Sequence, residues 1–182
     1  KELFEELQNI SNPMQAKEKA KVLQDVISAL QNLHNKEIIH RDLKTENILV
    51  NRSSGKTYLL DLGLSRTVKS KPSGLQGSAE YLSPETLLKK VQDIQSDTYA
   101  FGIMVHEMFS CGEILANPKQ GSNLRLQDDI KVFAYKYPRS IPQQAKIKIA
   151  NLVNSCLKYN TSERISDEEI IKKLEEIQID LS

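Results

Sequence analysis

The sequence predicts a mainly α-helical domain with one small β-hairpin element. Apolar residues recur at three- and four-residue steps in several segments, which is typical of amphipathic helices. Short β-favouring runs occur only between residues 37 and 60. The length of 182 residues, with 39% hydrophobic and 27% charged side chains, suits one soluble globular domain with a sizeable core.

Two helices are expected at the beginning of the chain. The first, within residues 1–10, would place four apolar residues on one face: Leu3, Phe4, Leu7 and Ile10. The second is predicted from about Gln15 to Asn35, because its apolar residues keep helical spacing. Those residues are Val22, Leu23, Val26, Ile27, Leu30 and Leu33.

Three β-favouring runs follow, at residues 37–40, 47–51 and 57–60. The last two are joined by Arg-Ser-Ser-Gly-Lys, residues 52–56, where glycine permits a positive φ. We therefore predict that these two runs pair as a hairpin. The polar stretch from Ser65 to Gly77 is predicted to be a loop.

Helical patterns return in the second half of the chain. Residues 94–109 are apolar almost all round, which indicates a helix buried in the middle of the domain. Further helices are predicted over residues 143–157 and 166–177. Ser166 and Glu169 form a capping-box pattern at the start of the last one.

Composition excludes some classes of function. The chain has 25 basic and 24 acidic side chains, a net charge of +1, so a broad positive field for nucleic acid is not expected. The apolar run at residues 100–105 is too short to span a membrane. Two cysteines, Cys111 and Cys156, lack metal-site spacing and favour a reducing, cytoplasmic location. Since the chain begins with Lys1, we expect further sequence upstream.

The candidate catalytic and metal-binding residues lie between the predicted strands and directly after the hairpin. Residues 40–47 read His-Arg-Asp-Leu-Lys-Thr-Glu-Asn, and residues 61–63, Asp-Leu-Gly, follow the hairpin. Asp42, Asn47 and Asp61 carry oxygen donors that suit Mg²⁺. With Lys44, they supply the groups that phosphoryl transfer needs.

With these motifs the chain resembles the eukaryotic-type protein kinase family, in its serine/threonine-like form. Residues 40–47 resemble the catalytic loop, residues 61–63 the Asp-Phe-Gly motif and residues 83–85 the Ala-Pro-Glu motif. Residues 96–102 are similar to the family's buried central helix, and Arg164 lies where the family pairs an arginine with the glutamate that is here Glu85. The order and spacing agree from near the start to about residue 174, which implies the protein kinase fold.

The resemblance implies ATP and Mg²⁺ as cofactors and a role for each matching residue. Asp42 would accept or orient the proton of the substrate hydroxyl, and Lys44 would neutralise charge on the γ-phosphoryl group. Asn47 and Asp61 would hold the metal ions. Leu49 would lie beneath the adenine, although an ordinary core leucine is the alternative. The full set implied to bind the nucleotide is Lys44, Glu46, Asn47, Leu49 and Asp61.

Lys44 resembles the serine/threonine pattern, so protein substrates with Ser or Thr acceptors are implied. Arg41 resembles the class regulated by a phosphate on the activation segment, added by an upstream kinase or by autophosphorylation. Thr67, Ser70, Ser73 and Ser78 are candidate phosphate acceptors, although polar loops are rich in such residues anyway. The implied activation-segment and substrate residues are Thr67, Ser70, Ser73, Gly77, Ser78, Tyr81 and Glu85.

Four residues are implied to be structural: His40 as a packed side chain, Arg41, Asp97 as an anchor for the catalytic-loop backbone, and Arg164. Leu62, which stands where the family has Phe, is expected to keep an apolar contact.

One departure is large: no Gly-x-Gly-x-x-Gly loop and no strand lysine precede Asp42. Residues 1–182 are therefore interpreted as the C-terminal, large lobe of a protein kinase catalytic domain, with the N-terminal lobe absent from this chain. The expected function is that of a serine/threonine kinase as part of a two-lobe domain, and the isolated chain is expected to be nearly inactive. The alternatives are a one-lobed pseudokinase that acts as a protein-binding module and an unrelated helical protein.

Overall fold

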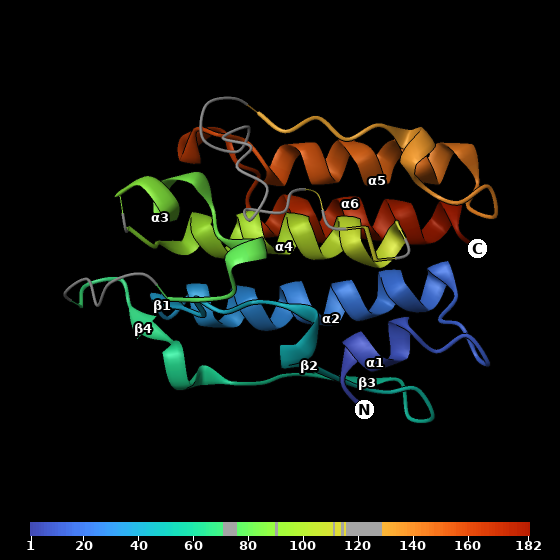
Figure 1. Cartoon of the computed structure of the whole chain (residues 1–182), viewed down its shortest axis with the longest axis horizontal. Helices are drawn as coiled ribbons and strands as arrows, with labels where there is room; N and C mark the ends of the chain where they lie inside the picture. Colours follow the sequence, from blue (N-terminus) through green and yellow to red (C-terminus); the bar gives the residue numbers. More distant parts are fainter. Residues whose placement is uncertain (71–75, 90, 111, 114, 116–128) are drawn as a thin grey trace.

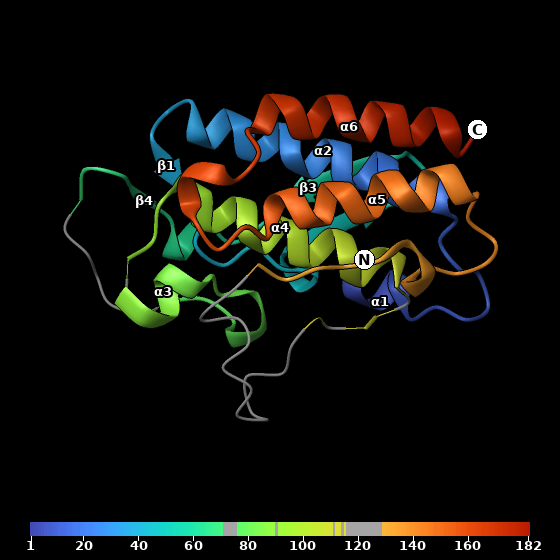
Figure 2. The ribbon, with the colours of Figure 1, turned by 90° about the horizontal axis from the view of Figure 1, so that it is seen from above.

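Four long helices form the body of the molecule. In the computed structural model, which describes residues 1–70, 76–89, 91–110, 112–113, 115 and 129–182, they lie side by side with their axes roughly aligned (Figures 1 and 2). Helix α2 packs on α4 and α6, and α5 packs on both of these as well. The four helices are α2 (Ala16–His34), α4 (Ile94–Phe109), α5 (Gln143–Cys156) and α6 (Asp167–Asp180). Their positions confirm the helices predicted from apolar spacing.

Helix α4 lies at the centre, and every residue from Ser96 to Phe109 is buried. It approaches α5 closely at Gly102, where an added Cβ would lie 2.5 Å from the Cβ of Cys156. The capping box predicted for α6 is confirmed, since the Ser166 hydroxyl accepts from the Glu169 amide at 3.3 Å. Among the described residues, no helix is both long and apolar enough to cross a membrane.

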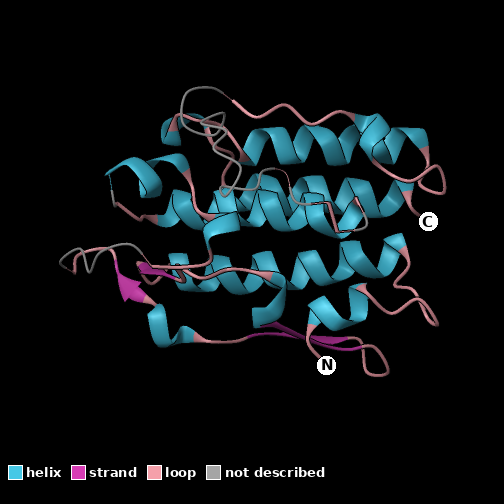
Figure 3. Ribbon diagram, in the orientation of Figure 1, coloured by secondary structure: helices cyan, strands magenta, loops and turns pink. Residues whose placement is uncertain are grey.

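The predicted hairpin is confirmed. Strands β2 (Ile48–Asn51) and β3 (Lys56–Leu59) pair antiparallel, with Ile48 opposite Leu59 and Asn51 opposite Lys56. Figure 3 shows the described strands on the half of the molecule opposite α5.

A second pair of strands contradicts the prediction of a loop over residues 65–77. Strand β4 (Arg66–Thr67) pairs antiparallel with β1 (Ile38–Ile39). Two polar residues carry no apolar alternation, and their partner lies far away in sequence, so local pattern could not reveal the pairing.

The shorter helices differ more from expectation. Helix α1 (Leu3–Leu7) ends before Ile10, whose side chain is 93% exposed, so the prediction that Ile10 shares the buried face is wrong. The Asn9 side chain accepts a hydrogen bond from the Asn12 amide at 3.1 Å, a local turn that replaces the helix. Helix α3 (Pro84–Lys89) was not predicted. Single 3₁₀ turns complete the described fold: Thr45–Asn47, Leu62–Leu64, Ala79–Tyr81, Ala134–Lys136 and Thr161–Glu163.

Candidate active site

The backbone of the loop at residues 40–47 is fixed by Asp97 on helix α4. One carboxylate oxygen of Asp97 accepts from the His40 amide at 2.7 Å, and the other accepts from the Arg41 amide at 2.9 Å. Asp97 is 1% exposed, and a carboxylate so deeply buried needs such donors. Arg41 takes a left-handed φ of +77°, which the two hydrogen bonds help to hold.

His34, at the end of α2, holds Asp97 from the other side. Its Nε2 lies 3.0 Å from Asp97 Oδ2, and its Nδ1 lies 2.7 Å from Asp167 Oδ2 at the start of α6. Burial by itself would lower the pKa of His34, but hydrogen bonds to Asp167 and Asp97 raise it to about 9. A charged imidazole therefore links three helices directly behind the loop. Sequence reasoning missed His34, because its partners lie 63 and 133 positions away.

His40 is fully buried, and its Nε2 lies 2.9 Å from the carbonyl oxygen of Leu60. This contact joins the loop to the hairpin, in keeping with a packed structural side chain.

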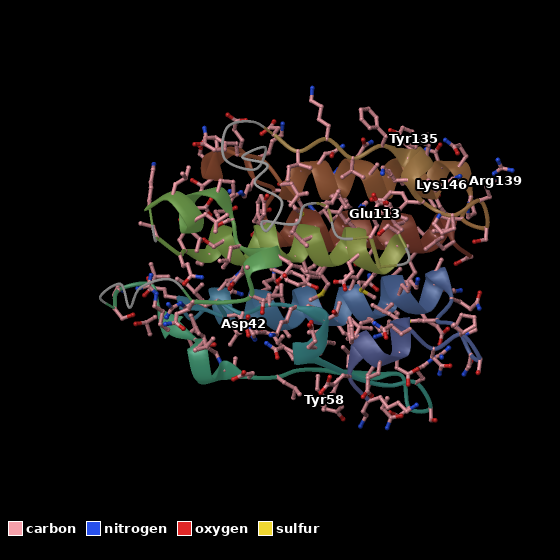
Figure 4. The ribbon with its side chains drawn as sticks, in the orientation of Figure 1. Asp42, Tyr58, Glu113, Tyr135, Arg139 and Lys146 are labelled. Atoms are coloured by element: carbon pink, nitrogen blue, oxygen red, sulfur yellow. The ribbon has the colours of Figure 1, made fainter. Side chains whose placement is uncertain are left out.

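The polar residues of the loop converge around the Asp42 carboxylate. Its Oδ1 accepts from the Ser78 amide at 2.9 Å and from the Ser78 hydroxyl at 3.1 Å. Asn47 donates from Nδ2 to Asp42 Oδ2 at 3.0 Å and to its backbone oxygen at 2.7 Å. The Lys44 ammonium lies 3.6 Å from Asp42 Oδ2 and donates to the Ser78 hydroxyl at 2.9 Å. Figure 4 places Asp42 on the half of the molecule that carries the hairpin.

Asp61 directly follows the residue that is hydrogen-bonded to Asn47 at the end of the hairpin. The Leu60 amide donates to the Asn47 carbonyl at 2.8 Å, one position beyond β3, and Asp61 follows at once. Asp61 has a φ of +57° and is exposed, and its Oδ1 accepts from the Gly63 amide at 3.1 Å. No group of three or more His, Cys, Asp or Glu side chains that could hold a metal occurs in the described part of the chain.

The neighbouring residues implied to bind nucleotide are half-buried. Strand β2 buries Ile48 and Val50, whereas Leu49 on its other face is only partly covered and lies outside the core cluster. The Glu46 carboxylate accepts from the Thr45 hydroxyl at 3.2 Å. Leu62 is 53% exposed, so the expected apolar contact of this side chain is largely missing from the described structure.

The segment around Ser78 rests directly on the loop. Gly77 has a φ of +104°, and a Cβ there would lie 2.5 Å from the Arg41 carbonyl oxygen, so only glycine fits. Of the other candidate acceptors, Thr67 and Ser70 are exposed, and the Ser70 hydroxyl donates to the Thr67 carbonyl at 2.7 Å. Ser73 lies outside the described residues.

Tyr81 points inward rather than toward a substrate surface. It is 8% exposed, and its hydroxyl donates to a carboxylate oxygen of Glu107 on α4 and lies 3.5 Å from the Thr45 hydroxyl. Burial raises the pKa of the Tyr81 phenol and that of the Glu107 carboxyl. Tyr81 thus ties this segment to the central helix.

Glu85 and Arg164 form the expected ion pair. Both guanidinium Nη atoms donate to the two Glu85 oxygens at 2.7 Å, and the Arg164 side chain has no exposed surface. Burial by itself would raise the pKa of Glu85, but hydrogen bonds from Arg164 and Ser83 hold it below its usual range.

Known protein kinases are similar to this chain in sequence. The family described as "Protein kinase domain" matches residues 1–174. Aurora kinase C of Mus musculus is 28% identical over 94% of the chain and 59% of its own length. The serine/threonine-protein kinase pim-2 of Danio rerio is 30% identical over 82% of the chain and 45% of its own length. A cGMP-dependent protein kinase of Toxoplasma gondii is 32% identical over 70% of the chain and 13% of its own length. The chain thus spans less than two thirds of each of these relatives.

Proposed function

The chain belongs to the protein kinase family, and from this premise we propose that it is the catalytic lobe of a serine/threonine kinase. The reaction is transfer of the γ-phosphate of ATP to Ser or Thr hydroxyls of protein substrates. The observation that carries the proposal is that Lys44, Asn47 and Ser78 all contact the Asp42 carboxylate.

In this proposal each polar group has one task. The Asp42 carboxylate, held by Asn47, orients the substrate hydroxyl and accepts its proton. The Lys44 ammonium stabilises negative charge on the transferred group. Ser78 binds Asp42 Oδ1 through its amide and hydroxyl, so the segment at residues 77–81 lies beside the catalytic carboxylate. A substrate chain that presents its hydroxyl to Asp42 would therefore lie against this segment.

The donor set fits Mg²⁺ and ATP. The Asn47 amide nitrogen donates to Asp42, which leaves the amide oxygen as a neutral ligand. The exposed Asp61 carboxylate belongs to the residue after Leu60, whose amide binds the Asn47 carbonyl. Two oxygen donors suit a magnesium ion that keeps phosphate and water ligands. When bound, the ion neutralises phosphate charge. The half-buried Leu49 offers an apolar surface for the adenine ring.

We further propose that a second, N-terminal lobe completes the site. Three apolar side chains along β3 and the segment after it support this proposal, with exposed fractions of 51% for Tyr58, 37% for Leu60 and 53% for Leu62. Figure 4 shows Tyr58 at the outer edge of the hairpin. Without a cover that excludes water and positions the nucleotide, the 182-residue chain is expected to have little activity.

The test compares Mg-ATP phosphotransfer to a generic basic protein by three samples. These are the complete polypeptide from its source, the same polypeptide with Asp42→Asn, and the 182-residue chain. The complete polypeptide should be active, and Asp42→Asn should lower kcat by about 10²- to 10⁴-fold. Activity of the 182-residue chain that depends on Asp42 would refute the need for a second lobe.

The same experiment decides between kinase and binding module. If the complete polypeptide transfers no phosphate, the one-lobed binding module replaces the enzyme as the leading function. The reducing, cytoplasmic location expected from the cysteines stays a prediction.

A further inference from the structure

Gln92 joins two segments that are far apart in sequence. It lies between α3 and α4 and is 5% exposed. Its Oε1 accepts a hydrogen bond from Arg41 Nε at 2.8 Å, and its Nε2 donates to the Gln76 carbonyl oxygen at 2.9 Å. The two ends of one amide therefore bind the catalytic-loop region and the segment that carries Ser78.

The amide suits this position chemically. A guanidinium offers only donors and a carbonyl only acceptors, whereas an amide presents one of each. A carboxylate at position 92 would satisfy Arg41 but not the Gln76 carbonyl, and an alkyl group would satisfy neither.

Two guanidinium groups, those of Arg41 and Arg66, donate to Gln92. Burial and the neighbouring Arg66 lower the pKa of Arg41. Neutral oxygens accept from the two guanidinium groups: Arg41 donates to the Leu64 carbonyl at 3.3 Å, and Arg66 donates to the Gln92 and Ser70 carbonyls at 2.8 and 3.1 Å. The segment is thus connected to Gln92 at both ends. Residues 64–70 are connected through Arg41 and Arg66, and Gln76 is bound by Gln92 directly.

The bridge acts next to the catalytic carboxylate. Gln76 is followed by Gly77, which packs on the Arg41 carbonyl, and by Ser78, whose amide binds Asp42. We propose that Gln92 is a positioning residue, which links Arg41 to Gln76 and so holds Ser78 against Asp42 without a phosphate on the segment. This inference rests on the proposed kinase function and concerns its regulation, since Arg41 alone implied control by phosphorylation.

The test uses the complete polypeptide after treatment with a serine/threonine phosphatase, with removal of phosphate verified by intact mass. Gln92→Leu is compared with the matched Gln95→Leu, because Gln95 lies three positions away and its buried Oε1 has no hydrogen-bond partner in the described structure. Wild type and Gln95→Leu should keep their activity. Gln92→Leu should lower kcat about tenfold and leave the KM for ATP unchanged. Gln92→Glu should behave like Gln92→Leu, because it lacks the donor to Gln76.

Hydrogen exchange provides a readout that needs no turnover. The Ser78 amide should exchange faster in Gln92→Leu than in wild type, while α4 peptides and Gln95→Leu stay unchanged. The inference is overturned if dephosphorylation abolishes wild-type activity, or if Gln92→Leu keeps the wild-type kcat and exchange rate. If wild type transfers no phosphate even before phosphatase treatment, while the exchange difference is present, the kinase proposal fails and the bridge stands.

Discussion

The Arg164 side chain has no exposed surface, so its charge is stabilised by Glu85, by the Tyr99 ring 5.0 Å away and by the backbone carbonyls of residues 95, 158 and 159. Replacing Arg164 by Met keeps most of the packing but leaves the Glu85 carboxylate buried without its main donor. We expect a loss of about 3–5 kcal/mol in the free energy of unfolding, measured by urea titration.

A matched control is available on the surface. Lys136 pairs with Glu113 at 2.8 Å, but both side chains are more than 40% exposed. Lys136→Met should therefore leave the free energy of unfolding nearly unchanged. Similar losses for the two Met variants would mean that burial does not set the strength of the Arg164 pair.

His34 makes stability depend on pH. Its pKa rises from 6.5 to about 9 on folding, so its stabilising effect is full below pH 6.5 and disappears as pH rises through about 9. The corresponding loss is about 3 kcal/mol. Urea titrations at pH 6 and pH 9.5 should show a larger decrease for wild type than for His34→Gln.

His106 gives the opposite case and serves as the control. Burial lowers its pKa from 6.5 to about 4, so the unfolded chain binds the proton first and stability falls as pH drops from 6.5 toward 4. His106→Gln should keep the alkaline loss and reduce the acidic one. An alkaline loss that survives in His34→Gln would exclude His34 as its source.

For single residues, the sequence predicted those site residues whose contact partners lie close to them in the chain. Asp42, Lys44 and Asn47 lie within six positions, and their spacing was enough to indicate a common site. Partners that are distant in sequence, such as Asp167 for His34 or Gln92 for Arg41, depend on tertiary packing and left no local signal.

At the scale of elements, helices with a continuous apolar face were predicted to within a few residues, because burial of that face determines them. The hairpin followed from its turn residues. Strand β4 and helix α3 were missed, since a two-residue strand and a six-residue helix are held by neighbours rather than by their own pattern.

Gly102 allows a test of how closely two elements approach. Alanine would raise helix propensity by about 1 kcal/mol. Its Cβ, however, would lie 2.5 Å from the Cys156 Cβ and 3.0 Å from a Leu157 methyl carbon. We expect Gly102→Ala to lose about 1–3 kcal/mol of stability net, and Gly102→Asn more, measured by urea unfolding.

Gly55 in the hairpin turn should show the reverse order. Its φ is +66°, and nothing lies within 4 Å of an added Cβ. Only backbone strain opposes a side chain there, and Asn tolerates a left-handed φ better than Ala does. Gly55→Asn should thus be less destabilising than Gly55→Ala. The same order at both glycines would contradict close helix packing at Gly102.

For the whole molecule, Tyr58, Leu60 and Leu62 are exposed apolar side chains on β3 and the segment after it, the edge that the proposed second lobe would cover. An apolar strip of this kind favours self-association when nothing covers it. We expect the 182-residue chain to self-associate in sedimentation velocity. Replacing all three residues by Ser should shift it toward monomer.

The control variant lies on the opposite half of the molecule, where Figure 4 shows Tyr135. Phe133 and Tyr135 stack on each other and are 54% and 76% exposed, so Phe133→Ser with Tyr135→Ser removes comparable apolar surface. This double variant should self-associate as wild type does. In the complete polypeptide the triple Ser variant should weaken phosphotransfer, because the same edge would then contact the second lobe. If the triple variant keeps full activity there and leaves self-association of the 182-residue chain unchanged, this edge is not an interface between lobes.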